Sequence, residues 1–143
     1  MQTFLPYSDF NQCAKVLDYR RLGKQRVEGM QIIQCIETPN RWQNHPAVRM
    51  WVGYEESLKL YVNVMIEEWI RRGYNNTMNL YPVHDMIFDT PIWLGDERVH
   101  SSHRANLLRK DYDFYSQYGW CEDCQEGYWW PYRRCEGEWV CYM

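Results

Sequence analysis

The feature that most constrains the fold is a helical repeat of apolar residues between residues 54 and 72. The repeat spaces them three or four residues apart, which places them on one side of an α-helix with glutamates opposite. These apolar residues are Leu58, Tyr61, Val62, Met65, Ile66 and Trp69. Two arginines and Gly73 follow, a sequence typical of a helix C-terminus. This segment is the strongest helix that the sequence predicts.

A second helical pattern runs from about residue 20 to residue 37, where apolar residues recur at spacings of three. Further helices are predicted over residues 10–17 behind an N-cap at Ser8 or Asp9, after His45-Pro46, and from Ser101 or Ser102 through the 112–118 region. No alternation of apolar and polar residues persists before residue 119. The predicted fold is therefore all-α, a single compact domain of three to five helices.

The 143 residues are expected to form a helical domain over residues 1–118, with an irregular segment rich in Cys and Trp, residues 119–143, packed on it. No basic stretch followed by an apolar run opens the sequence, and no apolar stretch approaches the roughly 18 residues of a membrane span. We therefore expect a cytoplasmic protein that does not enter a membrane.

Cations gather between Leu17 and Glu28, although the formal net charge of the chain is -3. Arg21, Lys24, Gln25 and Glu28 recur at spacings of three, four and seven, so they share one side of the predicted helix. Two interpretations are open. The stripe binds the phosphates of a polyanion such as DNA, or it is a solvated helix face.

Several motifs, in this order, resemble the pyrimidine-dimer DNA glycosylase family, and its bacterial and phage members of unassigned function are the most similar. The motifs span roughly residues 1–118: Thr3-Phe4-Leu5-Pro6-Tyr7, Tyr19-Arg20-Arg21-Leu22-Gly23-Lys24-Gln25-Arg26-Val27-Glu28, His45-Pro46-Ala47-Val48-Arg49-Met50-Trp51, Arg71-Arg72-Gly73-Tyr74, Trp93-Leu94-Gly95-Asp96 and His100-Ser101-Ser102-His103-Arg104. The resemblance implies an all-α domain that binds duplex DNA, flips a nucleotide and cleaves an N-glycosidic bond.

The sequence departs from the family at both catalytic positions. Gln2 is too bulky for ordinary removal of Met1, so the N-terminal nucleophile of the family is not expected. Arg21 stands where the family has its catalytic glutamate. Glu28, two helical turns further along, is the first candidate for a replacement carboxylate; the alternative is a structural glutamate paired with Lys24.

The resemblance also implies a phosphate-binding surface. Arg20, Lys24 and Arg104 lie at or beside positions where the family has basic residues that contact DNA. With their neighbours they make the predicted set of nucleic-acid or phosphate-binding residues: Arg20, Arg21, Lys24, Gln25, Arg26 and Arg104.

His100 and His103 are three residues apart near a predicted helix start, a spacing that suits two ligands or an acid–base pair. Histidine titrates near neutral pH, which suits protonation of a leaving base. The predicted catalytic residues are therefore Glu28, His100 and His103. The alternative for the histidines is a structural role in the core.

Cys121, Cys124, Cys135 and Cys141 follow the pattern C-x2-C-x10-C-x5-C. Four thiolates can hold a structural zinc ion, although the second pair is spaced too widely for a standard zinc knuckle. Free thiols and a disulfide are the alternatives. No cofactor is required by the predicted chemistry.

The sequence thus favours a hydrolase of DNA repair, an N-glycosidase-like enzyme acting on a modified or damaged base in DNA or in a free nucleotide. A non-catalytic module that binds nucleic acid through the cationic helix face is the second hypothesis, and a binder of small nucleotides is the third.

Overall fold

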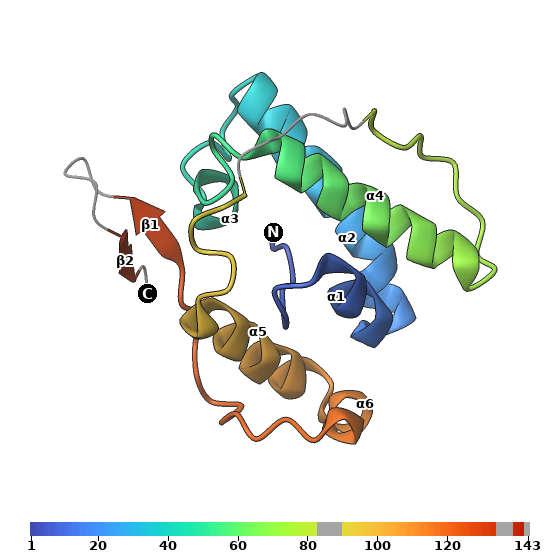
Figure 1. Ribbon diagram of the computed structural model, residues 1–143, viewed down its shortest axis with the longest axis vertical. Coiled ribbons are helices and arrows are strands. Elements are labelled where there is room, and N and C mark those ends of the chain that lie inside the picture. The colour runs from blue at the N-terminus through green and yellow to red at the C-terminus, as the bar shows by residue number, and fades with distance from the viewer. Residues whose placement is uncertain (83–89, 134–138, 142–143) are drawn as a thin grey trace.

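The computed structural model describes residues 1–82, 90–133 and 139–141, the side chains of residues 132, 133 and 139–141 excepted. Its elements are α1 (Phe10–Val16), α2 (Tyr19–Glu37), α3 (Pro46–Arg49), α4 (Glu55–Arg71), α5 (Glu97–Lys110), α6 (Tyr112–Tyr115), a 3-10 turn (Ser116–Tyr118) and the short strands β1 (Pro131–Arg133) and β2 (Trp139–Cys141) (Figure 1). The all-α prediction is confirmed. Four of the helices have seven or more residues, and the two four-residue helices α3 and α6 complete the described set.

Aspartate side chains fix where three of the helices begin. Asp9, Asp18 and Asp96 each accept a hydrogen bond from a backbone N–H in the first turn of α1, α2 and α5, respectively. The predicted start of α5 at Ser101 or Ser102 is therefore wrong. Ser102 is buried inside the helix, where its hydroxyl donates to the carbonyl oxygen of Val99 at 2.9 Å.

Helices α2 and α4 lie against each other along most of their lengths and form the largest helix pair of the fold (Figure 1). A glycine permits this close approach. At Gly29 a Cβ atom would collide with Cγ2 of Val62 on α4. Ile32 and Ile33 of α2 are buried at the same interface side of the helix.

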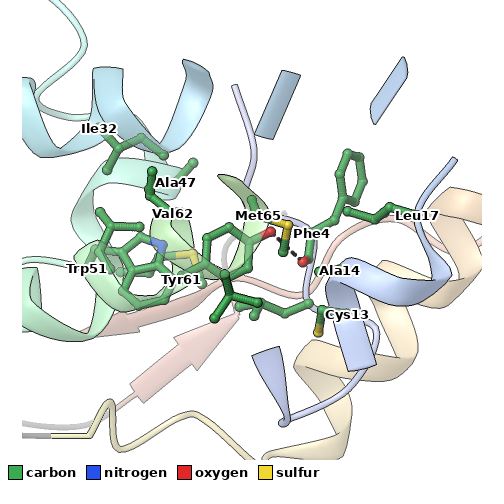
Figure 2. Packing of buried hydrophobic residues seen from close by; sticks show 14 of the residues in the cluster. Phe4, Cys13, Ala14, Leu17, Ile32, Ala47, Trp51, Tyr61, Val62 and Met65 are labelled. Atoms are coloured by element: carbon green, nitrogen blue, oxygen red, sulfur yellow. Dashed lines mark hydrogen bonds between the residues drawn. The ribbon is translucent and has the colours of Figure 1, made fainter. Parts of the chain in front are cut away.

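The core between these helices and the N-terminal segment is rich in aromatic rings. Figure 2 shows Trp51 beside the ring of Tyr61, whose hydroxyl points toward Phe4. The hydroxyl of Tyr61, a fully buried residue of α4, donates to the Phe4 carbonyl oxygen at 2.7 Å, so the N-terminal segment satisfies it.

Residues 2–5 run without helix through the middle of the molecule, between the α2–α4 pair and α5 (Figure 1). All four residues are buried. Because this backbone has no helical partners, its polar groups must be satisfied by side chains from the surrounding helices. Gln25, His100 and His103, which the sequence suggests for a functional site, are among those side chains.

After Gly119 the described chain has no helix, and β1 pairs antiparallel with β2. This segment contacts the helical core through partly buried residues: Trp120, Cys124, Tyr128, Trp129 and Trp130. The boundary at residue 118 between a domain and an appended segment stays a prediction. No helix in the described ranges is long and apolar enough to cross a membrane.

Candidate functional site

A cavity of about 1020 Å³ opens between the start of α2, the N-terminal segment and the junction of α5 with α6. We call it the α2 cavity. Its lining residues are Met1, Gln2, Phe4, Asp18, Tyr19, Arg20, Arg21, Lys24, Gln25, Glu28, Lys110, Asp111, Phe114 and Tyr128. The volume is at the upper end of the roughly 300–1,000 Å³ that is usual for small-molecule sites.

The predicted stripe on α2 faces this cavity. Arg20, Arg21, Lys24, Gln25 and Glu28 all line it, because their spacings bring them to one side of the helix. Five of the nine predicted site residues outside the cysteines are thus brought together. The stripe forms one wall of the cavity, with Arg20 and Lys24 exposed to solvent. Its binding of phosphates stays a prediction.

Arg21 is occupied by an ion pair. Its Nη1 lies 3.1 Å from Oδ1 of Asp18, the N-cap residue of α2. The hydroxyl of Tyr115 donates to the same carboxylate. Burial would raise the pKa of Asp18, but the hydrogen bonds from Tyr115 and Arg21 outweigh it and lower that pKa. Arg21 therefore balances a buried carboxylate at the cavity wall.

Glu28 is the partly buried carboxylate on the cavity side of α2. Its Oε2 accepts a hydrogen bond from Nε2 of Gln25 at 3.2 Å. Lys24 and Glu28 are both described, and no ion pair joins them, so the alternative of a structural pair across one turn is not what the structure has. Within the described ranges Gln25 is the side chain that bonds to this carboxylate, which leaves acceptor capacity for a ligand or water.

Gln25 holds the N-terminal segment against the cavity. Its Oε1 accepts from the backbone N–H of Phe4 at 2.8 Å, and its Nε2 donates to the carbonyl oxygen of Gln2 at 3.1 Å. Because Gln25 is also bonded to Glu28, the cavity wall and the N-terminal segment share one hydrogen-bond network. Gln25 therefore fixes the N-terminal segment relative to α2.

His100 and His103 do not line the α2 cavity. Both instead form hydrogen bonds with the backbone of Leu5. The N–H of Leu5 donates to Nδ1 of His103 at 2.8 Å, and its carbonyl oxygen lies 2.7 Å from Nδ1 of His100. Nε2 of His100 accepts from the N–H of Gly95 at 2.9 Å, so Nδ1 of His100 carries the proton. The i, i+3 spacing brings the two rings to a single residue of the buried segment.

Burial keeps both histidines neutral. It lowers the pKa of His103 to about 3, with a smaller contribution from His100. It also lowers the pKa of His100, against an opposite effect of the Leu5 carbonyl. An acid–base role requires a proton exchanged near neutral pH, and neither the burial nor these pKa shifts favour it.

Two of the predicted phosphate-binding arginines also have other partners. Arg104 is only 12% exposed and bonds to Glu97, Glu122 and the carbonyl oxygen of Pro6. Arg26 lies over the ring of Trp69 at 4.3 Å and donates to Asn76 at 2.7 Å. Neither lines the α2 cavity.

The cavity also has lining residues that the sequence does not predict for the site, and three polar ones among them come from distant parts of the chain. Lys110 and Asp111 come from the end of α5, and Tyr128 comes from the C-terminal segment. Burial raises the pKa of Tyr128 to about 12, opposed by the nearby Gln2 amide, so its hydroxyl stays protonated. The sequence does not reveal that these residues lie near α2. They reach the cavity only because α5 and the C-terminal segment pack beside it.

The zinc prediction lies partly outside the described residues. Cys135 and the side chain of Cys141 are not described, whereas Cys121 is exposed and Cys124 is half-buried, both as free thiols. Among the described residues no group of three or more metal-binding side chains is present. Four-cysteine coordination stays a prediction.

The comparison with protein families finds one matching family. The model of the pyrimidine dimer DNA glycosylase family matches residues 1–82, which include the N-terminal segment, α2 and α4. The chain belongs to this family. Neither the curated proteins nor the solved structures contain a significant match to it.

Proposed function

We propose that the protein is a DNA N-glycosidase that hydrolyses the bond between a damaged or modified base and its sugar in the α2 cavity. The observation that carries this proposal is Glu28, a carboxylate with free acceptor capacity on the wall of a cavity rimmed by cations. Family membership supports DNA as the substrate. A nucleotide must leave the base stack to enter such a cavity.

The reaction assigned to Glu28 is activation of water. Cleavage of an N-glycosidic bond develops positive charge on the sugar, which a nearby carboxylate stabilises. The water oxygen bonds to the anomeric carbon, Glu28 takes a proton from that water, and the base departs with the electron pair of the broken bond. Arg21, which stands at the position of the family's glutamate, stays paired with Asp18 during the reaction and takes no part in it.

The cavity rim suits the phosphates that flank an extrahelical nucleotide. Arg20, Lys24 and Lys110 are exposed on this rim, and they form no ion pair with any residue in the described ranges. Cations that form no ion pair within the described ranges can replace the counterions of the DNA backbone. These contacts would hold the strand without reading its sequence.

Tyr128 is the proposed hydrogen-bond donor to the leaving base. Its raised pKa keeps the phenol protonated at neutral pH, so it can donate to a ring nitrogen or carbonyl on which negative charge develops. His100 and His103 enter the proposal as positioning residues, because they fix Leu5 and thereby the segment that carries Gln2 and Phe4 to the cavity.

The test is release of free base under single-turnover conditions, from a panel of duplexes that each contain one damaged or modified base. The variant Glu28→Gln keeps the size and the hydrogen-bonding capacity of the side chain but not its charge. We expect it to bind the substrate duplex as the unmodified protein does and to release base roughly 10²- to 10⁴-fold more slowly.

Treatment with borohydride during turnover distinguishes water from an amine as the nucleophile, since it traps an imine between protein and sugar. Hydrolysis by water predicts no trapped adduct. A trapped adduct, or unchanged base release by Glu28→Gln, would contradict the assigned role of Glu28.

A binding module without catalysis is the second candidate, favoured by the Arg21–Asp18 pair at the position of the family's glutamate. It predicts the same salt-dependent binding to DNA but no base release from any member of the panel. Equal affinity of the unmodified protein and Glu28→Gln, without product from either, would select this candidate.

A further inference from the structure

A second hollow of about 420 Å³ adjoins the α2 cavity on the outer side of the same helix. We call it the aromatic groove. Its lining residues are Tyr19, Arg20, Gly23, Lys24, Val27, Glu28, Gln31 and Trp69. Four of them, Tyr19, Arg20, Lys24 and Glu28, also line the α2 cavity. A linear polymer bound in the cavity can therefore continue directly into the groove.

A stack of three aromatic rings reaches the groove through Tyr19 and Trp69, which line it. The rings of Trp69 and Tyr74 are 4.4 Å apart with an interplanar angle of 29°, and those of Tyr74 and Tyr19 are 6.0 Å apart at 28°. Tyr19 is 48% exposed and Tyr74 is 40% exposed. Within each of the two pairs the rings are tilted by at most 29°. Tyr19 and Tyr74 offer much of their surface to solvent, as in proteins that stack unpaired bases.

The position of Trp69 is fixed by the protein itself. A Cβ atom at Gly23 would lie 3.0 Å from its ring, so the glycine, which is disfavoured inside a helix, lets the indole rest directly on α2. Its Nε1 donates to the carbonyl oxygen of Asn75 at 2.7 Å, and the guanidinium of Arg26 lies 4.3 Å from the ring centre. The aromatic surface is therefore preorganised.

The charges at the groove match a nucleotide. Arg20 and Lys24 stand between the groove and the cavity, and they have no ion-pair partner in the ranges that the structure describes. Apolar and aromatic side chains, Val27 and Trp69, form the other side of the groove. A flat base can stack on the apolar and aromatic side while its adjacent phosphate binds the cations. An apolar peptide would contact the first side but leave the cations without an anionic partner.

We propose that the aromatic groove binds the base of a nucleotide next to the target, in an unpaired stretch of the same strand. The inference rests on the proposed function for placing the target nucleotide in the α2 cavity. It adds a substrate preference: a target beside an unpaired base is bound more tightly than one whose neighbours are held in a duplex or lack a base.

The test uses two single-stranded probes and isothermal titration calorimetry. One probe is an oligothymidylate of five nucleotides. In the other the four outer nucleotides are abasic, so that they keep their sugars and phosphates and only the central nucleotide keeps its base. Stacking of one base predicts that the unmodified protein binds the first probe about fivefold to a hundredfold more tightly. Tyr19→Ala should bring this ratio close to one, and Tyr19→Phe, which keeps the ring, should preserve it.

A matched pair of charge variants tests the location. Val27 lines the groove but not the α2 cavity, and Val52 is 58% exposed and lines neither. Val27→Glu should weaken binding of the oligothymidylate severalfold, whereas Val52→Glu adds the same charge and should leave binding unchanged. An equal loss in both variants would overturn the assignment to the groove.

The two proposals fail separately. Base release from the damaged duplexes with a probe ratio of one would overturn the groove proposal and leave the glycosidase standing. A ratio that depends on the ring of Tyr19, with no base released from any duplex, would support the groove and overturn the glycosidase. Absence of binding to either probe would overturn the groove proposal.

Discussion

The polar residues of α2 and those of α5 both suggest a site in the sequence, but the fold uses them in opposite ways. Lys24 and Glu28 on α2 face an open cavity, and both have polar atoms that can bond to a ligand there. His100 and His103 on α5 are buried, and three of their four ring nitrogens bond to backbone groups. A polar group that already has its hydrogen bonds inside the protein stabilises the fold. A polar group at a cavity that still lacks hydrogen-bond partners can bind a ligand.

The largest expected difference between the two regions is in stability. His103→Ala leaves the buried N–H of Leu5 without an acceptor and creates a void, so the free energy of unfolding should fall by roughly 3 kcal/mol. Arg20→Ala on the α2 side should cause little change, because Arg20 is exposed and its hydrogen bond is to the exposed Tyr19. Urea unfolding followed by circular dichroism compares the two variants. A smaller loss in His103→Ala than in Arg20→Ala would reverse the assignment.

Acid should destabilise the histidine region selectively. His103 has a pKa of about 3 in the folded protein and 6.5 when unfolded, so the unfolded state takes up the proton first as the pH falls. The stability that depends on neutral His103 is complete above pH 6.5. It falls by about 1.4 kcal/mol per pH unit below that value, which makes about 2 kcal/mol at pH 5.

The variant His103→Asn retains an acceptor for Leu5 but does not titrate. Its unfolding free energy should therefore depend less steeply on pH between 6.5 and 4 than that of the unmodified protein. Equal slopes for the two proteins, measured by denaturant titrations at several pH values, would show that His103 is not buried in its neutral form.

Binding to DNA should change in the α2 region. The double variant Arg20→Ala, Lys24→Ala removes two of the cavity's exposed cations, so affinity for a duplex should fall about tenfold at low salt. The slope of log affinity against log salt concentration should decrease by about two. Lys15 and Arg41 are exposed and lie outside the α2 cavity, and their double alanine variant is the control. Equal losses in both variants would indicate nonspecific attraction alone.

The smallest expected effect is that of Glu28→Gln on stability. Gln25 is the hydrogen-bond partner of Glu28, and a glutamine can keep this contact, so the unfolding free energy should change by less than about 0.5 kcal/mol. Glu68 is the matched control, since it is buried and paired with Arg71 and Arg72. Glu68→Gln should lower the melting temperature clearly. A comparable decrease of the melting temperature in Glu28→Gln would show that Glu28 has a structural role.

Local patterns in the sequence predict much of this fold. The helices found as α2 and α4 begin and end within one residue of the predicted bounds, because their apolar repeats and terminal residues are continuous in the sequence. The start of α5 was placed too late, since serines and Asp96 are all acceptable N-caps and only packing decides among them. The stripe from Arg20 to Glu28 was predicted as a surface for the same local reason.

The rest of the site depends on contacts between distant parts of the chain. Leu5 precedes the two histidines by 95 and 98 residues, so their spacing alone could not distinguish a ligand pair from a backbone clamp. Tyr128 reaches the cavity from a segment without regular periodicity. The close approaches at Gly23 and Gly29 likewise depend on residues of α4, and a glycine in a helical pattern does not reveal its neighbour.

The position of the site can be tested without knowledge of the damaged base. Titration of the ¹⁵N-labelled protein with the five-nucleotide oligothymidylate, followed by amide chemical shifts, maps the bound surface residue by residue. We predict that the largest shifts lie in residues 18–28 and at Lys110 and Asp111, around the α2 cavity. Largest shifts in residues 97–104 of α5, with α2 unchanged, would contradict this account.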